Sequence, residues 1–302
     1  MQFKATQWDA RYFQMAFQLL FLCYGLLFLH WSAEWWSYFL FISSGLLFQL
    51  IANSIAAKKI LLNPFAGGGW KSVLVSCFSL CLLLKTNEWY ICVLASAITI
   101  FSKYIFRFKR KHIFNPSAFG IAAAVYLTGN AWISPGQWGS NMVLFFAIIC
   151  LGCIVVTKVQ KLDVTLAFIG TYAALLFSRQ ILYLGWPADF FIQSVTTGGL
   201  LLFSFFMITD PKTTPNHPVA RIIWGIAVAG VSFYLSAFKF INGAPIWVLV
   251  CSQPLVPLLD YLFKAKQFEW KQPLLTSPEG RNKARLKLSI SLLNNYNKQL
   301  NN

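Results

Sequence analysis

Two short polar motifs interrupt apolar stretches of this chain, and both hold side chains that could bind a polar ligand. The first is TDPKTTP at residues 209–215, which follows the apolar run at residues 203–208. The second is FNPSAFG at residues 114–120, which also leads into an apolar run. A carboxylate or an amide at the mouth of a hydrophobic helix costs free energy unless it is paired or used. Both motifs are therefore candidates for a binding site or a proton path.

The same motifs predict helix starts. In Asn115-Pro116, and likewise in Asp210-Pro211 and Asn63-Pro64, a capping side chain stands before a proline at the first helical position. A helix that begins this way presents free backbone amides and the positive end of its dipole, which suits a carbonyl-rich or anionic ligand. Capping alone is the competing interpretation, and we favour it for Asn63-Pro64.

The composition indicates which elements position these motifs. Of the 302 residues, 57% are hydrophobic and 11% are charged, whereas about a quarter of a soluble domain is charged. Apolar runs of near 20 residues recur along the chain, long enough to cross a bilayer core of about 30 Å. We predict an all-α, polytopic membrane protein whose ten helices lie at about 13–30, 35–53, 70–86, 88–106, 116–133, 141–157, 163–183, 190–208, 219–238 and 245–263.

The basic residues predict the orientation of those helices in the lipid bilayer. With the N-terminus in the cytoplasm, 22 of the 25 Lys and Arg fall on the inside, and only Lys85, Arg179 and Lys239 fall outside. This asymmetry is what the positive-inside rule predicts. Both termini are then cytoplasmic, the first helix is retained rather than cleaved, and we expect a bacterial inner membrane. The predicted domains are a ten-helix domain at 1–264 and a basic tail at 265–302, the latter either an interfacial helix or a disordered end.

Charge and cysteine content bound the other possibilities. The net charge of +16 lies mostly in short loops beside predicted helices, where it faces anionic lipids, so we expect no nucleic acid partner. Cys77 with Cys81, and Cys150 with Cys153, share helix faces. Four thiolates could hold an iron–sulfur cluster or zinc. We favour buried structural cysteines instead, and predict no metal site.

Three stretches carry a resemblance to a known family. A basic loop runs from Lys103 through His112 into Asn115-Pro116, and GGLLL at residues 198–202 continues into Thr209-Asp210-Pro211. The chain then ends its last predicted helix with PLVPLLD at residues 254–260. In these stretches it resembles the membrane protein family shared by the Rnf electron-transport complex, as RnfD, and the sodium-translocating NADH:quinone oxidoreductase, as NqrB. It looks most like stand-alone members, some of which are labelled enediyne biosynthesis protein UnbU.

The resemblance implies ten transmembrane helices in two inverted five-helix repeats, with flavin and quinone chemistry in the membrane. Family members attach FMN to a threonine in a Ser-Gly-Ala-Thr motif, which this sequence lacks, so we do not expect covalent FMN. Other members hold riboflavin non-covalently against the Asn-Pro loop. The site residues carried over on this basis, or placed beside it, are His112, Asn115, Pro116, Lys103, Gly198, Gly199, Thr209, Asp210, Lys212 and Asp260. We expect either carboxylate to pair with Lys103 or Lys212, or to serve a proton or cation path.

Three functional classes stay open at this point. The first is a redox membrane subunit that binds riboflavin, another non-covalent flavin or a quinone, and exchanges electrons with partner proteins at the cytoplasmic face. The second is a carrier or channel for a small solute. The third is a non-catalytic assembly subunit. The sequence favours the first class, and leaves the donor, the acceptor and any coupling ion unnamed.

Overall fold

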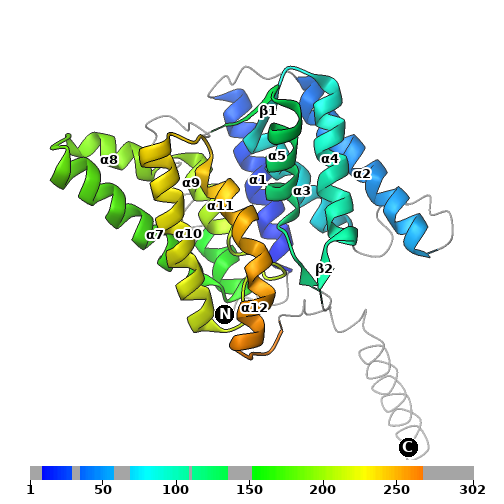
Figure 1. Cartoon of the computed structure of the whole chain (residues 1–302). Helices are drawn as coiled ribbons and strands as arrows, with labels where there is room; N and C mark the ends of the chain where they lie inside the picture. The colour runs from blue at the N-terminus through cyan, green and yellow to red at the C-terminus, as the bar shows by residue number, and fades with distance from the viewer. Residues whose placement is uncertain (1–8, 29–34, 58–68, 109–110, 135–151, 268–302) are drawn as a thin grey trace, which may run out of the picture. The chain divides into compact units, whose positions relative to one another are not determined.

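The structure, a computed structural model, describes residues 9–28, 35–57, 69–108, 111–134 and 152–267 (Figure 1). Ala10–Gln267 form one compact unit, while Met1–Asp9 and Phe268–Asn302 form a second, of which only Asp9 is described. The predicted tail at 265–302 therefore lies almost wholly outside the described residues. So does most of the predicted sixth helix at 141–157.

The described chain is mostly helical. The helices are α1 (Ala10–Leu27), α2 (Trp35–Ala57), α3 (Trp70–Leu83), α4 (Trp89–Ile105), α5 (Pro116–Thr128), α7 (Leu162–Phe177), α8 (Ala188–Val195), α9 (Gly198–Leu202), α10 (Pro218–Lys239), α11 (Ala244–Ser252) and α12 (Val256–Leu262). Two π-helical segments, η2 (Ser178–Tyr183) and η3 (Phe203–Met207), continue α7 and α9, and a 3-10 turn, η4 (Gln253–Leu255), joins α11 to α12. Short π-helical segments are frequent near functional sites, and η3 ends at Met207, two residues before Thr209.

Helix length and composition agree with an integral membrane protein. Within the described residues, four helical segments are long and apolar enough to cross a membrane: Trp35–Ala57, Leu162–Tyr183, Pro218–Lys239 and Ala244–Leu262. A fifth arises if Ala188–Val195 and Gly198–Met207, which meet at 44°, form one bent span. The remaining apolar helices α3, α4 and α5 are shorter. The count of ten helices therefore stays a prediction.

Two of the predicted spans are longer than the helices observed. The span at 70–86 ends as a helix at Leu83 and continues as strand β1 (Leu84–Thr86), and the span at 116–133 ends at Thr128 before strand β4 (Ala131–Ile133). Gly129 terminates α5 in the left-handed conformation, with φ +65°, which glycine adopts without steric cost. Strands β1 and β4 pair in antiparallel fashion. A second antiparallel pair joins β2 (Arg107–Phe108) to β3 (Lys111–His112).

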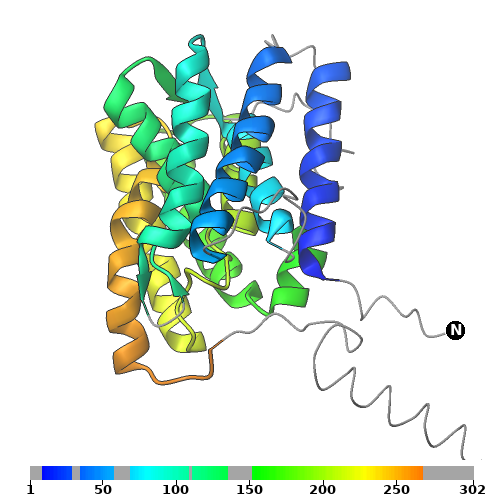
Figure 2. The ribbon, with the colours of Figure 1, turned by 90° about the vertical axis from the view of Figure 1, so that its right-hand side faces the viewer.

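The helices pack in two comparable groups. In the first, α2 lies against α3 and α4, and α4 against α5; in the second, α7 lies against α10, and α10 against α11 (Figures 1 and 2). Small residues allow the close contacts that membrane helices use. A side chain on Gly120 would meet Thr99 and the Ala95 carbonyl oxygen of α4. Contacts between α5 and α11 join the groups, and this places Asn115 of the first group beside the polar loop of the second.

Candidate functional site

The TDPKTTP motif forms a tight turn after η3. The helix start predicted at Asp210-Pro211 is therefore wrong, because the next helix, α10, begins at Pro218 with His217 as its cap. The predicted start at Asn63-Pro64 lies outside the described residues. The Asp210 carbonyl oxygen accepts the backbone N–H groups of Thr213 at 3.1 Å and Thr214 at 3.0 Å. The Asp210 carboxylate accepts the backbone N–H of Lys212 at 3.0 Å, which is the Asx-turn arrangement that favours aspartate here. The motif is thus fixed by its own hydrogen bonds, and it holds several carbonyl groups toward neighbouring helices.

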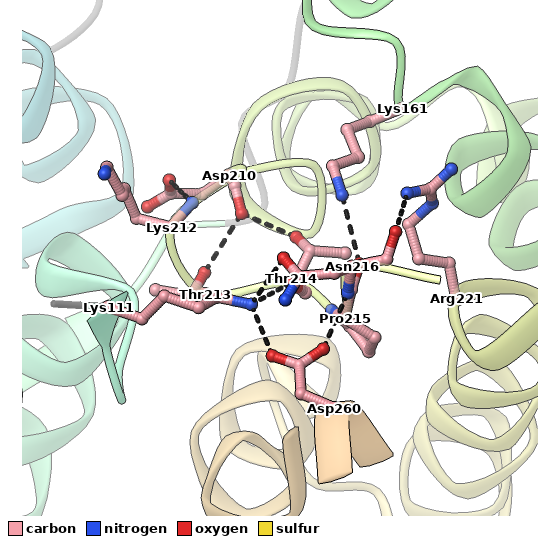
Figure 3. Close-up of polar contacts among 10 residues, drawn as sticks. All are labelled: Lys111, Lys161, Asp210, Lys212, Thr213, Thr214, Pro215, Asn216, Arg221 and Asp260. Carbon is pink, nitrogen blue, oxygen red and sulfur yellow. Dashed lines mark hydrogen bonds and ion pairs between the residues drawn. The ribbon is translucent and has the colours of Figure 1, made fainter. Parts of the chain in front are cut away.

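Lys111 and Asp260 clamp this turn from two directions (Figure 3). The Lys111 ammonium contacts the Asp260 carboxylate at 2.8 Å and donates to the Thr214 carbonyl oxygen at 2.7 Å. The other Asp260 oxygen accepts the Asn216 backbone N–H at 2.7 Å. Both ionic side chains are largely withdrawn from solvent, with 11% and 17% of their surface exposed. Strand β3, the turn and α12 are therefore joined by one charge-assisted cluster.

Two further cations attach the turn to α7 and α10. Lys161, which precedes α7, donates to the Pro215 carbonyl oxygen at 3.0 Å. Arg221 of α10 donates to the Asn216 carbonyl oxygen at 2.8 Å and, through Nε, to the Asp163 carboxylate at 2.7 Å. We call these interacting residues the charged loop cluster: Lys111, Lys161, Asp163, Asp210, Lys212, Thr213, Thr214, Pro215, Asn216, Arg221 and Asp260.

Asn115 connects the other motif to this cluster. Its side-chain oxygen accepts the Ala118 N–H at 3.2 Å, so it caps α5 as the sequence predicts. Its side-chain nitrogen donates to the Met207 carbonyl oxygen at 3.1 Å, and its backbone N–H donates to the Gln253 side chain at 2.8 Å. Asn115 is buried. Asn115 is therefore hydrogen-bonded to the last residue of η3, two residues before the TDPKTTP motif, and it serves both as the α5 cap and as the link to that segment.

Two buried polar atoms close to Asn115 have no hydrogen-bond partner among the described residues. They are Nε2 of Gln253 and Nδ1 of His112. Buried polar atoms in folded proteins are almost always paired with protein, water or a ligand. The Gln253 side chain accepts a hydrogen bond from the Asn115 backbone, and His112 precedes Asn115 by three residues. The two unpaired atoms therefore indicate a place near Asn115 where a polar ligand could bind.

Burial shifts the ionisation of these groups. It lowers the pKa of Lys161 to about 7, an effect that nearby Arg221 and Lys111 reinforce. It lowers the pKa of Lys111 despite the hydrogen bond to Asp260, and it raises the pKa of Asp210 despite the Lys212 N–H and the nearby cations. Burial also lowers the pKa of His112 to about 4, with help from the positive charges of Lys103 and Arg107. Lys111, His112, Lys161 and Asp210 thus bring groups of shifted pKa to one region, a feature that functional sites often share.

A cavity of about 660 Å³ opens beside the cluster, within the size range of small-molecule sites. Its polar lining includes Lys111, His112, Asn216 and Asp260. Its apolar lining comes from the hairpin and from the proline-rich start of α12: Phe108, Ile113, Pro254, Val256, Pro257 and Leu258. Ammonium, amide, imidazole and carboxylate groups supply both donors and acceptors. The residues present therefore fit a planar ring that carries carbonyl and imide groups, such as a flavin or a quinone head group.

The structure gathers most, but not all, of the predicted site residues. His112, Asn115, Pro116, Thr209, Asp210, Lys212 and Asp260 lie in or next to the charged loop cluster. Lys103 lies in α4 and donates to the Ser72 carbonyl oxygen at 3.0 Å rather than forming an ion pair. Gly198 and Gly199 lie at the start of α9, whereas the charged loop cluster follows η3, which continues α9. Gly199 lines a separate cavity of about 160 Å³.

Among the described residues, neither Asp210 nor Asp260 forms the expected ion pair with Lys103 or Lys212, although the charges of these two lysines act on Asp210. Asp260 pairs with Lys111, and Asp210 accepts the backbone of Lys212 instead of its ammonium. The sequence argument also missed Arg221 and Asp163, which pair between α7 and α10. The sequence held a signal for this pair. Asp163 and Arg221 fall in the first turns of two predicted helices that start on the same side of the membrane, so an ion pair between them was possible. Nothing in the sequence specified which acid met which base.

The cysteine hypothesis is tested only where the chain is described. Within those residues, no group of three or more His, Cys, Asp or Glu side chains is placed to hold a metal ion. Cys77 and Cys81 are buried between helices, and Cys153 is part-buried, while Cys150 lies outside the described residues.

Comparison with known proteins supports the resemblance over the second half of the chain. Residues 125–269 match the model of the NQR2, RnfD, RnfE family. The D component of the ion-translocating oxidoreductase complex from Tolumonas auensis is 36% identical over 97 residues, which cover 31% of this chain and 27% of that protein. The D component of the same kind of complex from Stutzerimonas stutzeri is 30% identical over 74 residues, covering 24% of this chain and 21% of that protein.

These matches are partial, since they span about a quarter of the length of the curated relatives. The matched region 125–269 nevertheless includes η3, the TDPKTTP turn, Arg221 and Asp260, and so most of the charged loop cluster. The family model and both relatives therefore support the family that the motifs of this chain resemble, namely the NQR2, RnfD, RnfE family.

Proposed function

We propose that the chain is an RnfD/NqrB-like integral membrane subunit of an electron-transport system, and that it binds a flavin or a quinone non-covalently beside the charged loop cluster. The observation that carries this proposal is the hydrogen bond from Asn115 to Met207, which brings the Asn-Pro motif to the segment that leads into TDPKTTP, near a cavity of about 660 Å³ lined by Lys111, His112 and Asp260. Within the family, we place the chain with the stand-alone, UnbU-like members, as the motifs at 114–120 and 207–213 suggest.

The cavity suits such a ligand because its lining is apolar on one side and hydrogen-bonding on the other. Phe108 and Pro257 offer flat apolar contacts, while Lys111 and Asn216 offer donors. The orphaned Nδ1 of His112 is a buried hydrogen-bonding atom of a residue in that wall. A bound flavin would supply the one- and two-electron chemistry, and the protein groups near its ring would tune it. The residues of this chain would orient the ring and exclude water.

The same proposal includes the topology. The contacts of α2 with α4 and of α7 with α10 are the equivalent pairs expected if five-helix halves repeat. Lys111, Lys161, Lys212 and Arg221 all gather at the end of α5 that carries Asn115. Their common end supports a cytoplasmic location for that end, with both termini inside and the protein in a bacterial inner membrane. Partner redox proteins would dock there.

An absorbance and fluorescence spectrum of the detergent-purified protein, before and after denaturation, tests the redox proposal. We expect flavin absorption that unfolding releases into solution, or a quinone that organic extraction recovers. His112→Leu should lower the ligand content, and Asn242→Leu, at the far end of α5, should not. Asn115→Leu is a harsher test, because Asn115 also caps a helix. Folded protein that contains neither flavin nor quinone would contradict the proposal and favour a solute carrier or an assembly subunit.

A further inference from the structure

A second cavity, of about 160 Å³, lies at the end of α5 opposite Asn115. Both helix groups line it: Leu83 and Ile133 come from α3 and β4, while Tyr172 and Ser236 come from α7 and α10. It has room for about five water molecules, or for one organic molecule of about five non-hydrogen atoms. Among the described residues, it shares no lining side chain with the cavity of about 660 Å³. The two cavities are therefore separate sites.

The polar lining of the second cavity is uncharged. It consists of hydroxyls and one amide: Ser134, Tyr172, Ser194, Thr197, Ser236 and Asn242. None of the described lining residues is Lys, Arg, His, Asp or Glu. Asn242 donates through Nδ2 to the Ile133 carbonyl oxygen at 3.1 Å, which leaves its side-chain oxygen as an acceptor for a ligand. A charged ligand would lose its hydration here without meeting a counter-ion, so the lining suits an uncharged one.

The backbone is unwound beside these hydroxyls. Helix α8 ends at Val195, α9 begins at Gly198, and the two segments meet at 44°. Thr197 stands at this break and lines the cavity. Gly199 also lines it, and a residue without a side chain allows a ligand to approach the backbone closely. Within a membrane, non-helical backbone is tolerated where it is buried in protein or lines a hydrated cavity. The place of the break therefore supports a polar occupant.

Two polar atoms without a partner border the same cavity. Gln180 donates through Nε2 to the Ser194 hydroxyl at 3.1 Å, but its buried Oε1 has no partner among the described residues. The hydroxyl of Ser232, a fully buried residue, also lacks a partner there. Ser232 lies one helical turn before Ser236, on the same face of α10. Because buried polar atoms are almost always paired with protein, water or a ligand, these atoms indicate further hydrogen-bonding capacity around the cavity.

We propose that this cavity binds a small uncharged polyol, about the size of glycerol. Thr197 and Ser236 come from different segments, and their hydroxyls donate and accept hydrogen bonds to the polyol hydroxyls. The Asn242 oxygen accepts another, while Leu200 and Phe203 cover the carbon atoms. Substrate sites of membrane carriers lie at the interface of two repeats, and this cavity lies between the two helix groups. The proposal goes beyond the redox function and does not rest on it.

Saturation-transfer NMR on the full chain in deuterated detergent tests this proposal, with glycerol as the probe. We expect transfer of saturation from the protein to glycerol. Thr197→Val and Ser236→Ala should each raise the dissociation constant about fivefold, because each removes one hydrogen-bonding hydroxyl. Thr128→Val is the matched control and should leave binding unchanged, since the Thr128 hydroxyl donates to the Ala124 carbonyl oxygen within α5 and does not line the cavity.

A second comparison uses the parent chain alone and so does not depend on the folding of any variant. Propane-1,3-diol lacks the middle hydroxyl of glycerol and should bind about fivefold more weakly. Thermal unfolding of each variant in the same detergent shows whether a loss of binding reflects a loss of folded protein.

Three results would overturn the proposal. Absence of transfer to glycerol in the folded parent chain would show that water alone fills the cavity. Tighter binding of glycerol 3-phosphate would assign the cavity to a charged ligand. Displacement of glycerol by sodium chloride, but not by choline chloride at the same ionic strength, would assign it to a cation. Flavin and quinone content enter none of these measurements, so this proposal and the redox proposal can fail independently.

Discussion

The two ends of α5 are joined to their neighbours by different kinds of contact. At the Asn115 end, charged and amide side chains from β3, α7, α10 and α12 converge on one turn and border a cavity of about 660 Å³. At the other end, β1 and β4 pair through their backbones, and Asn242 donates to the Ile133 carbonyl oxygen at 3.1 Å. The cavity there is about 160 Å³, and its polar lining is of hydroxyls and an amide: Ser134, Tyr172, Ser194, Thr197, Ser236 and Asn242.

The difference separates contacts that are enough to hold the fold together from contacts that the fold alone does not require. At the β1–β4 end the contacts are backbone pairs, the Asn242 amide, and the Lys85 ammonium, which donates to the Tyr38 hydroxyl at 2.8 Å. Buried charges at the other end carry a desolvation cost that apolar packing would avoid, and orphaned polar atoms lie among them. Such an arrangement is expected at a binding or proton-transfer site rather than at a structural joint. Three predictions test this contrast.

The largest effect is expected for Asp260→Ala. The change leaves the Lys111 ammonium and the Asn216 N–H without their acceptor, and removing one member of a buried ion pair costs about 3 kcal/mol. The measurement is thermal unfolding of the purified protein in one detergent. Asn242→Ala is the matched change at the β1–β4 end and should cost about 1 kcal/mol. Equal losses at the two ends would remove the distinction drawn between them.

A smaller effect is expected for Asn115→Ala. The variant loses the α5 cap, for about 1 kcal/mol, and leaves the buried Met207 carbonyl oxygen without its donor, for about 1 kcal/mol more. Asn115→Asp keeps the cap but loses the donor, so it separates the two contributions in the same unfolding measurement. If the aspartate variant matched the parent, the link between the two motifs would carry no stability.

The smallest effect is the pH dependence contributed by Lys161. Its pKa is about 7 in the folded protein and near 10.5 in the unfolded chain. The unfolded state therefore binds more protons between these values, and stability from this group rises as pH increases from about 7, by at most about 1.4 kcal/mol per pH unit. Lys161→Met should flatten the stability profile between about pH 7 and 8. An unchanged slope would show that Lys161 is not buried as described.

Several features of this architecture were predictable from local sequence. Asn115-Pro116 starts a helix with the expected cap. Lys85 and Gly129 fall within the third and fifth predicted spans, and they lie where those helices give way to strands. Other features were not. The span at 190–208 is bent between α8 and α9, and the last span is interrupted at Gln253–Leu255, because prolines and paired glycines and threonines permit a break without fixing its angle.

The sequence by itself determined the class of this protein and the polar motifs that matter. Long apolar runs, one-sided basic loops and the Asn115-Pro116 helix start are local properties, and each has a direct physical consequence in a bilayer. Only the tertiary structure decided the partners. Lys111 rather than Lys103 meets Asp260, and Asn115 meets Met207 across the two helix groups. Those choices depend on helix rotation and on which helices touch, and both follow from packing over the whole chain rather than from any one segment.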